Sequence, residues 1–272
     1  MKRTIAFSLI LLVFSVVSSF GQGNSIQKVP LSQADIDRIV KNFTEHEAKF
    51  RTALTDYVFN RNANINTVGM GGQITGTYHR ESFMALTTSG ERIEKILLFP
   101  VSTLTEISVT PEDLEDLGGV NPFALEPTAI DQYNFNYVGK EKIDDLNLYV
   151  FDVTPKVMPN PKKSKLRLFT GRVWVDDRDL MIVKTRGKAV PETKENKFPV
   201  VETWRENIDG KYWFPTYASS DDELVFDNGQ SVRLKMRVKY DNYKLGRTDV
   251  RILDDDTPPD AKPTPTPAPK KP

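Results

Sequence analysis

The chain has 272 residues, of which 39% are hydrophobic and 27% charged, with a formal net charge of zero and no cysteine. The even charge balance argues against a nucleic-acid surface, which requires a clear basic excess. Without cysteine there are no disulfides and no cysteine-linked lipid anchor, so stability must come from an ordinary apolar core, for which residues 22–256 are sufficient.

Residues 1–21 have the layout of a secretory signal peptide. Lys2 and Arg3 precede an apolar run from Ile5 to Phe20, and a small residue, Gly21, follows it. An uncleaved membrane anchor is the alternative, but the run contains four serines and is shorter than the roughly 20 residues that span a bilayer. We therefore expect cleavage near Gly21, a mature chain that does not span a membrane, and a periplasmic or secreted location.

Residues 31–57 predict an amphipathic helix. Ser32 suits the N-cap position, and Asp35 stands three residues later, as in a capping box. From Ile36 to Leu54 apolar residues recur at helical spacing with charges between them. We interpret this apolar stripe as a face that packs on the core.

From Tyr57 onward the pattern changes to a period of two, which is typical of strands. In residues 232–240 apolar side chains alternate with arginine and lysine, so one face is apolar and the other cationic. Asn228-Gly229 and Asp209-Gly210 predict tight hairpin turns. Further strand candidates are 74–87, 92–100, 104–109, 133–140, 146–153, 166–175, 180–186, 200–206, 212–217 and 223–226. Sequential hairpins of this kind predict an antiparallel meander that curls or is covered on its apolar face.

Two segments interrupt or follow the strands. Thr110 and Pro111 predict the start of a short helix that ends near residue 117, and a second short helix or turn is expected over 121–126. Residues 257–272 alternate proline with threonine, alanine and lysine and are expected to be extended or disordered. The expected organisation is a signal peptide (1–21), one domain (22–256) and a proline-rich tail (257–272), which is either passive or an envelope tether.

No segment carries a recognisable catalytic or metal motif. His46 has no second histidine at helical spacing, and His79 lies in a strand candidate. No Gly-x-Ser-x-Gly elbow is present, and the acids at 176–179 and 221–223 are interpreted as turn residues rather than as a paired-acid site. The sequence predicts no cofactor, no bound metal and no catalytic residue.

One loop has an unusual charge. Lys162, Lys163, Lys165 and Arg167 follow two prolines. Such a stretch either meets an anionic lipid headgroup or a partner, or is a loop kept soluble by its charge.

Aromatic residues gather on the predicted strands. Phe135 and Tyr137 share one face of a strand, Tyr149 and Phe151 share one face of the next, and Trp174 follows in a later strand. The aromatic face of a curled sheet either fills the interior or lines a cavity for an apolar ligand. The sequence leaves both outcomes open.

Three stretches give the chain a family resemblance. They are 133–140 with 149–155, 169–176 with 181–184, and 212–217, of which Gly171-x-Val-Trp-Val-Asp176 followed by Ile182-Val-Lys184 is the most specific. Together they resemble the LolA/LolB-like lipoprotein-sorting family over about residues 31–250. The resemblance implies a mainly β (α+β) fold, in which a curved antiparallel sheet forms a half-open β-barrel with an N-terminal helix and a short helical lid. It also implies an apolar interior that holds acyl chains, and it carries over no catalytic residue.

The leading hypothesis is a monomeric, non-catalytic binding protein for lipid or lipoprotein acyl chains, acting as a carrier or envelope sensor. Its partners would be an acyl lipid or a lipid-modified protein, with an envelope protein as a further partner and no nucleic acid. The candidate ligand-binding residues are Phe135, Tyr137, Tyr149, Phe151 and Trp174 on strands, and Leu114, Leu117, Phe123 and Leu125 in the lid. The alternatives are an interaction module with a filled core, and a hydrolase that acts on envelope polymers.

Overall fold

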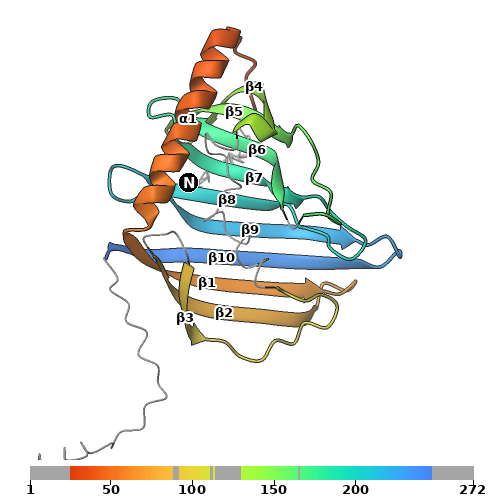
Figure 1. Ribbon diagram of the computed structural model, residues 1–272. Coiled ribbons are helices and arrows are strands. Elements are labelled where there is room, and N and C mark those ends of the chain that lie inside the picture. Colours follow the sequence, from red (N-terminus) through yellow and green to blue (C-terminus); the bar gives the residue numbers. More distant parts are fainter. Residues whose placement is uncertain (1–24, 88–91, 111–112, 114–129, 165, 247–272) are drawn as a thin grey trace, which may run out of the picture.

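The computed structural model describes residues 25–87, 92–110, 113, 130–164 and 166–246 (Figure 1). These residues form one α-helix, α1 (Gln33–Leu54), a 3-10 turn, η1 (Ile130–Gln132), and ten strands. The strands are β1 (Tyr57–Val68), β2 (Ile74–Leu86), β3 (Arg92–Leu98), β4 (Tyr133–Ile143), β5 (Leu146–Pro155), β6 (Leu168–Asp176), β7 (Ile182–Val190), β8 (Val201–Asn207), β9 (Trp213–Val225) and β10 (Ser231–Leu245). The expected signal peptide, the lid at 114–125 and the tail at 257–272 lie outside the described residues.

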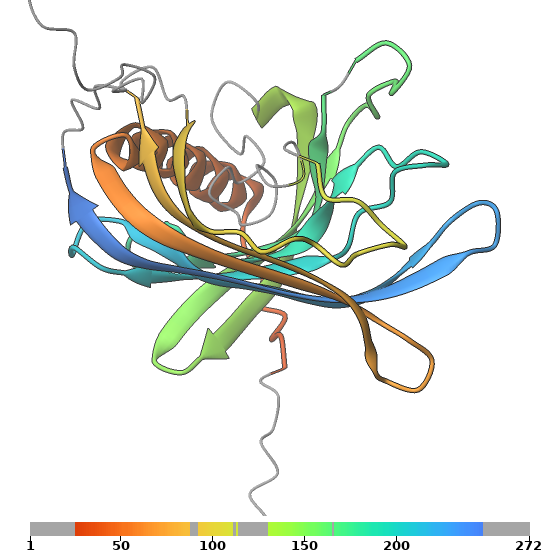
Figure 2. The same cartoon turned by 90° about the horizontal axis from the view of Figure 1, so that it is seen from below.

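All ten of these strands belong to one antiparallel sheet. Their order is β3-β2-β1-β10-β9-β8-β7-β6-β5-β4, so the first and last strands of the chain pair in the middle of the sheet. Within the described residues the pairing ends at β3 and β4, and the sheet curves without closing (Figures 1 and 2). The predicted mainly β fold with a half-open barrel and an N-terminal helix is confirmed.

Helix α1 lies across the concave face of the sheet (Figure 2). Its N-cap is as predicted, because the Ser32 hydroxyl oxygen accepts a hydrogen bond from the Asp35 amide at 3.1 Å. One side of the helix is buried, with Phe43 in its first half and Phe50 in its second. The first half packs on β4–β7 and the second half on β1, β9 and β10. Among the described residues, no helix combines the length and apolar character needed to cross a membrane.

The alternation predicted for β10 is confirmed. Its inward residues from Val232 to Tyr240 are buried, and the arginines and lysines between them are exposed. The turns on either side of β9 contain Gly210 and Gly229 with φ of 78° and 83°, a backbone conformation that glycine adopts without a steric cost. These two hairpins therefore fix the register of the central strands.

Two strand predictions were wrong. Residues 104–109 form no strand. They run beside β2, where the Thr103 amide donates to the Thr77 carbonyl oxygen at 2.9 Å, and their apolar side chains pack on the core without a continuing ladder. Residues 212–217 and 223–226 are not separate strands, because β9 runs on to Val225. Asp221 lies inside this strand rather than in a turn, and it is 3.1 Å from Arg233 on β10.

Candidate functional site

Four of the predicted ligand-binding aromatics lie together on β4 and β5. The Phe43 ring of α1 meets two of them, and its centroid is 5.7 Å from that of Phe135 and 5.8 Å from that of Phe151. Tyr137 lies 5.4 Å from Phe151 and 6.3 Å from Tyr149 between ring centroids. Phe43 and Phe151 are fully buried, whereas Phe135, Tyr137 and Tyr149 are partly exposed. The helix thus covers Phe135 and Phe151, and a ligand that bound between them and Phe43 would require α1 to move. We call this cluster, with Phe43, the filled region.

Trp174 lies on the opposite face of the sheet. It packs with Leu148, Val150 and Val183, and its indole nitrogen donates to Glu141 at 2.7 Å. The structure therefore does not bring Trp174 together with the other four aromatics. The remaining candidates are in the expected lid and lie outside the described residues: Leu114, Leu117, Phe123 and Leu125.

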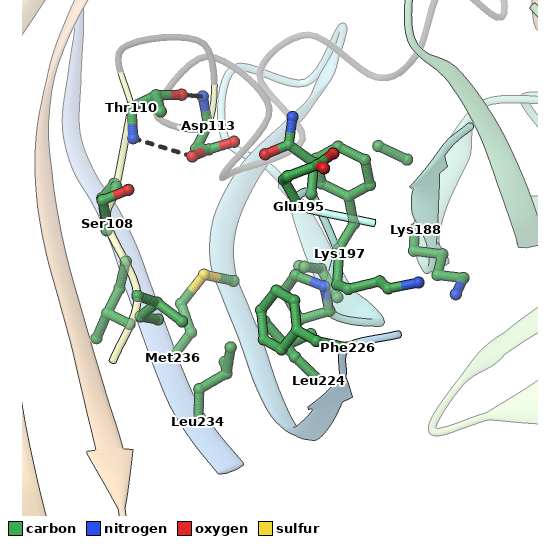
Figure 3. Close-up of a pocket in the computed structure, with 18 of the residues that line it drawn as sticks. Ser108, Thr110, Asp113, Lys188, Glu195, Lys197, Leu224, Phe226, Leu234 and Met236 are labelled. Atoms are coloured by element: carbon green, nitrogen blue, oxygen red, sulfur yellow. Dashed lines mark hydrogen bonds between the residues drawn. The ribbon is translucent and has the colours of Figure 1, made fainter. Parts of the chain in front are cut away.

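A cavity of about 260 Å³ opens on the concave face, away from the filled region (Figure 3). Its floor is aliphatic and comes from three strands: Ile65 of β1, Leu224 of β9, and Leu234 and Met236 of β10. All four residues are buried. Figure 3 shows Leu224, Leu234 and Met236 gathered with Phe226 at one side of the hollow. Alternation of side chains along paired strands puts these residues on one face.

The walls of the cavity are segments without regular structure. Ile107 and Val109 come from the segment that follows β3, and Phe198 comes from the β7–β8 loop. Ile107 and Val109 pack against the cluster to which the floor belongs, but their segment has no regular packing face, and the cavity lies between it and the floor. The volume is close to the lower limit of about 300 Å³ for small-molecule pockets, which suits a single acyl chain or part of one.

The rim of the cavity is polar, and side-chain hydrogen bonds and an ion pair hold its segments in place. The Thr110 amide donates to an Asp113 carboxylate oxygen at 2.9 Å, and the Asp113 amide donates to the Thr110 hydroxyl at 3.1 Å (Figure 3). This reciprocal pair agrees with the predicted cap at Thr110. Arg167 lies 3.1 Å from Asp113 and 4.6 Å from the centre of the Phe198 ring, so it joins both walls.

The lysines of the rim have acidic partners. Lys197 is 2.8 Å from Asp227, and Lys188 is 3.0 Å from Glu192. The hydrogen bond with Asp227 raises the pKa of Lys197, and the same contact lowers the pKa of Asp227. The two lysines of the lining are thus paired with acids, and the other charged residues that line the cavity, Glu106, Asp113 and Glu195, are acids. A lining without an unpaired lysine around an apolar floor suits a ligand whose recognised part is apolar rather than anionic.

Gly187 marks the boundary between the cavity and the filled region. It lines the cavity, and the ring of Phe169, which belongs to the same buried core as Phe43 and Phe151, lies directly over it. A Cβ at this position would be 2.4 Å from Phe169 Cε2 and 2.4 Å from the Thr170 carbonyl oxygen. The absence of a side chain is therefore what lets Phe169 close the end of the filled region.

A buried ion pair holds α1 at its middle. Arg205 of β8 donates two hydrogen bonds to Glu47 of α1, at 2.7 and 3.0 Å, and each side chain is at most 4% exposed. The guanidinium also lies 5.2 Å from the centre of the Phe50 ring. Two charges removed from water need such a matched geometry. The pair fixes where along the sheet the helix lies.

A second charged cluster ties the edge strand β3 to the concave face. Glu94 accepts hydrogen bonds from Arg61 at 2.6 Å, from Arg80 at 2.9 and 2.7 Å, and from Ser82. Burial by itself would raise the pKa of Glu94, but the hydrogen bonds from Ser82 and Arg80 and the charges of Arg61 and Arg80 together lower it. This carboxylate therefore stays ionised and structural.

The acids and histidines considered for catalysis have structural partners. Asp176 accepts the amides of Arg178 and Asp179 at 2.9 and 3.2 Å, as the turn prediction for this segment requires. His46 Nδ1 is 3.1 Å from the Leu180 carbonyl oxygen, and His79 Nε2 is 3.2 Å from Glu81. In the described part of the chain, histidines and acids form no group of three or more that could hold a metal ion.

No protein-family model matches this chain, and no curated protein matches it significantly in sequence. Solved structures do match. A DUF1329 family protein from Desulfovibrio piger is similar with a TM-score of 0.41 and 14% identity over 80% of this chain and 95% of that one. The LolA superfamily protein NE2245 from Nitrosomonas europaea is similar with a TM-score of 0.32 and 15% identity over 75% of this chain and 94% of that one. Similarities of this extent do not determine function.

Sequence reasoning missed the residues that form the cavity floor. Ile65, Leu224, Leu234 and Met236 belong to apolar strand faces that were expected only to pack. The sequence did contain a signal for them, because it predicts one long helix, and one helix is too short to cover ten strands. The predicted site was based on aromatic residues, which lie in the part of the sheet that the helix covers.

Proposed function

We propose that this protein is a non-catalytic binding protein for acyl chains, which serves as a carrier or sensor in the periplasm or outside the cell. The observation that carries the proposal is the cavity of about 260 Å³ with its aliphatic floor of Leu224, Leu234 and Met236. A cavity with an aliphatic floor on the concave face of a folded chain is a feature that an apolar ligand would fill.

The physical reason is the transfer of hydrocarbon out of water. Each methylene buried in such a cavity contributes about 0.8 kcal/mol, so even a partly buried chain binds measurably. Because both lysines of the lining are paired with acids, the rim gives little attraction for an anionic group. We therefore propose that the acyl chain is recognised in the cavity while its headgroup, or the protein to which it is linked, stays at the rim.

The filled region favours a second candidate, an interaction module with a complete core. Phe43 and Phe151 are fully buried, and the Phe43 ring packs against Phe135 and Phe151 as in a core. The two candidates differ in what they require of the cavity. A binding protein needs it to accept a ligand, whereas an interaction module needs only the rigid sheet.

The test is native mass spectrometry with lipid extraction on the protein purified from the periplasm of a bacterial host, followed by titration with a fluorescent fatty acid. We expect a stoichiometric acyl lipid, or saturable binding of the fatty acid. Met236→Trp, which places an indole in the cavity, should weaken binding at least about tenfold, because that loss equals roughly two methylenes. Tyr149→Leu in the filled region should leave the affinity unchanged.

Two results would contradict the proposal. One is a protein that carries no lipid and binds no fatty acid, which would leave the interaction module. The other is the reverse pattern of the two variants, with Tyr149→Leu weakening binding and Met236→Trp having no effect. That pattern would indicate that the ligand binds at the aromatic residues of β4 and β5.

A further inference from the structure

The loop between β5 and β6, residues 156–167, combines exposed apolar side chains with cations. Three apolar residues in it are unusually exposed: Val157 by 78%, Met158 by 54% and Leu166 by 50%. The twelve residues contain four lysines and one arginine and no acid. Apolar residues grouped on a surface in this way mark an interaction site.

The lysines of this loop are available to a partner. Lys156, Lys162 and Lys163 are exposed, and among the described residues none of the three has an acid within ion-pair distance. The lysines of the cavity rim differ in this respect, because both are paired with acids. The charge of the loop is therefore unbalanced locally in a protein whose overall charge is zero.

The described part of the loop is held in shape by its own hydrogen bonds. Asn160 accepts from the Lys162 amide through its side chain at 2.9 Å and from the Lys163 amide through its carbonyl oxygen at 3.0 Å. The Ser164 hydroxyl accepts from the Leu166 amide at 3.0 Å. The Lys156 amide donates to the Gln132 carbonyl oxygen at 2.7 Å. The exposed side chains are consequently presented by a defined backbone.

The base of the loop is joined to the mouth of the cavity. Arg167 is its last residue, and it contacts Asp113 at 3.1 Å and lies 4.6 Å from the centre of the Phe198 ring. Both of these residues line the cavity. In Figure 2 the loop, drawn in green at the upper right, projects from the sheet on the side where α1 lies. Whatever the loop binds is thus brought near the cavity.

We propose that the β5–β6 loop is a docking site for the surface of an anionic lipid bilayer. Val157, Met158 and Leu166 would enter the boundary between headgroups and acyl chains, and the exposed Lys156, Lys162 and Lys163 would lie among the lipid phosphates. This docking proposal rests on the proposed function and extends it. Docking of the loop would place the mouth of the cavity at the membrane surface, where acyl chains are exchanged. A protein partner is less suited, because a stable interface buries about 800 Å² on each side, more than a short projecting loop offers.

The experiment is a vesicle flotation assay on the protein exported and purified from a bacterial host, with its N-terminus established by intact mass. Wild type should bind vesicles of phosphatidylglycerol and phosphatidylethanolamine, and bind pure phosphatidylcholine vesicles at least about tenfold more weakly. The double variant Val157→Ser/Met158→Ser and the double variant Lys162→Gln/Lys163→Gln should each lower the partition coefficient on anionic vesicles by about tenfold or more.

Matched controls change the same residue types elsewhere on the surface. Met70→Ser/Val225→Ser removes two apolar side chains that are 109% and 61% exposed, and Lys235→Gln/Lys239→Gln removes two lysines from the outer face of β10. Both control proteins should keep the wild-type partition coefficient within about twofold, since neither change alters the loop. All of these positions are on the surface, and unchanged thermal unfolding would confirm that every variant folds.

Three outcomes would overturn the docking proposal. They are equal binding of wild type to both kinds of vesicle, loop variants that bind as wild type does, and binding of the loop to an acidic peptide such as polyglutamate but not to vesicles. The fluorescent fatty acid titration in solution separates this result from the proposed function. A wild-type protein that binds the fatty acid but not the vesicles would overturn the docking site alone. A wild-type protein that binds the vesicles but not the fatty acid would overturn the ligand site alone.

Discussion

The concave face of this sheet is covered by two different kinds of structure. Over β4–β7 the helix supplies the fully buried Phe43, whose ring packs against Phe135 and Phe151. Over β1, β9 and β10, at the strand ends away from the helix, the segment after β3 and the β7–β8 loop form the cover, and a cavity of about 260 Å³ remains. Both floors are apolar. The difference teaches that the cover, rather than the strand face, decides whether an apolar surface becomes core or a binding site.

The two regions should respond differently to mutation. In the filled region Phe43 and Phe151 are fully buried, so removing atoms from them leaves a void. The floor residues of the cavity border a volume of about 260 Å³, so added atoms can be accommodated there.

The largest effect is expected for Phe43→Ala. Removing a fully buried ring from the filled region should lower the free energy of unfolding by about 3–5 kcal/mol. Chemical denaturation measures this directly, with Phe43→Leu as a control that should lose less. A loss below about 1 kcal/mol would show that the helix is not packed as the structure has it, and the contrast between the two regions would fail.

Glu47→Gln should cost nearly as much, about 3 kcal/mol, because it leaves the Arg205 guanidinium buried without a counter-charge. The double variant Glu47→Leu/Arg205→Leu removes both charges and should recover most of the loss. Urea unfolding of the two variants tests this. If the double variant is no more stable than the single one, the ion pair does not position the helix.

Gly187→Ala tests the boundary between the regions. Its methyl group would meet the Phe169 ring and the Thr170 carbonyl oxygen at 2.4 Å, which should cost about 1–3 kcal/mol. Gly71→Ala is the control, because an added Cβ there meets only the flexible side chain of Gln73. A thermal melt that shows equal stability for the two variants would mean that Phe169 does not close the filled region.

Two methionines allow a direct comparison of packed and open positions. Met236→Trp extends into the cavity and should change the free energy of unfolding by less than about 1 kcal/mol. Met84→Trp inserts the same ring at a buried position that does not line the cavity, and it should destabilise by about 1–3 kcal/mol. Equal losses, measured by chemical denaturation, would indicate that the cavity closes in solution.

The smallest effect concerns pH. The pKa of Glu94 is lower in the folded chain than its ordinary value of 4.5, so its ionised form stabilises the fold. This stabilisation is complete above pH 4.5 and is lost as the pH falls through the lower, folded pKa. Denaturation of wild type and Glu94→Gln at several pH values should show a stability difference that shrinks below pH 4.5. A constant difference down to pH 2 would contradict this linkage.

Much of the fold was predictable because the local signals agreed. Ser32 and Asp35 marked the helix start, and glycines after Asn228 and Asp209 marked two hairpins that the structure contains. The wrong strand and turn predictions arose where the local sequence pattern disagreed with the pairing between strands. Residues 104–109 have an apolar pattern but no neighbouring strand to continue the ladder, and Asp221 is held in β9 by its cross-strand partner rather than placed in a turn.

The candidate site was harder to predict for a physical reason. A strand pattern shows which side chains share a face, but it does not show what covers that face. Phe135 and Phe151 were correctly expected on the concave side, yet only the position of α1 shows that Phe43 lies over them. Leu234 and Met236 gave the same apolar signal, and the cavity arises from irregular segments whose path no periodicity reveals.

The most direct test of the central claim is a crystal structure of the protein soaked with a fatty acid that carries bromine on its chain. We expect an anomalous bromine peak in the cavity bounded by Leu224, Leu234 and Met236, with α1 in place. A peak against Phe135 and Phe151 beneath a displaced helix, or a cavity that stays without ligand at saturating fatty acid, would contradict it.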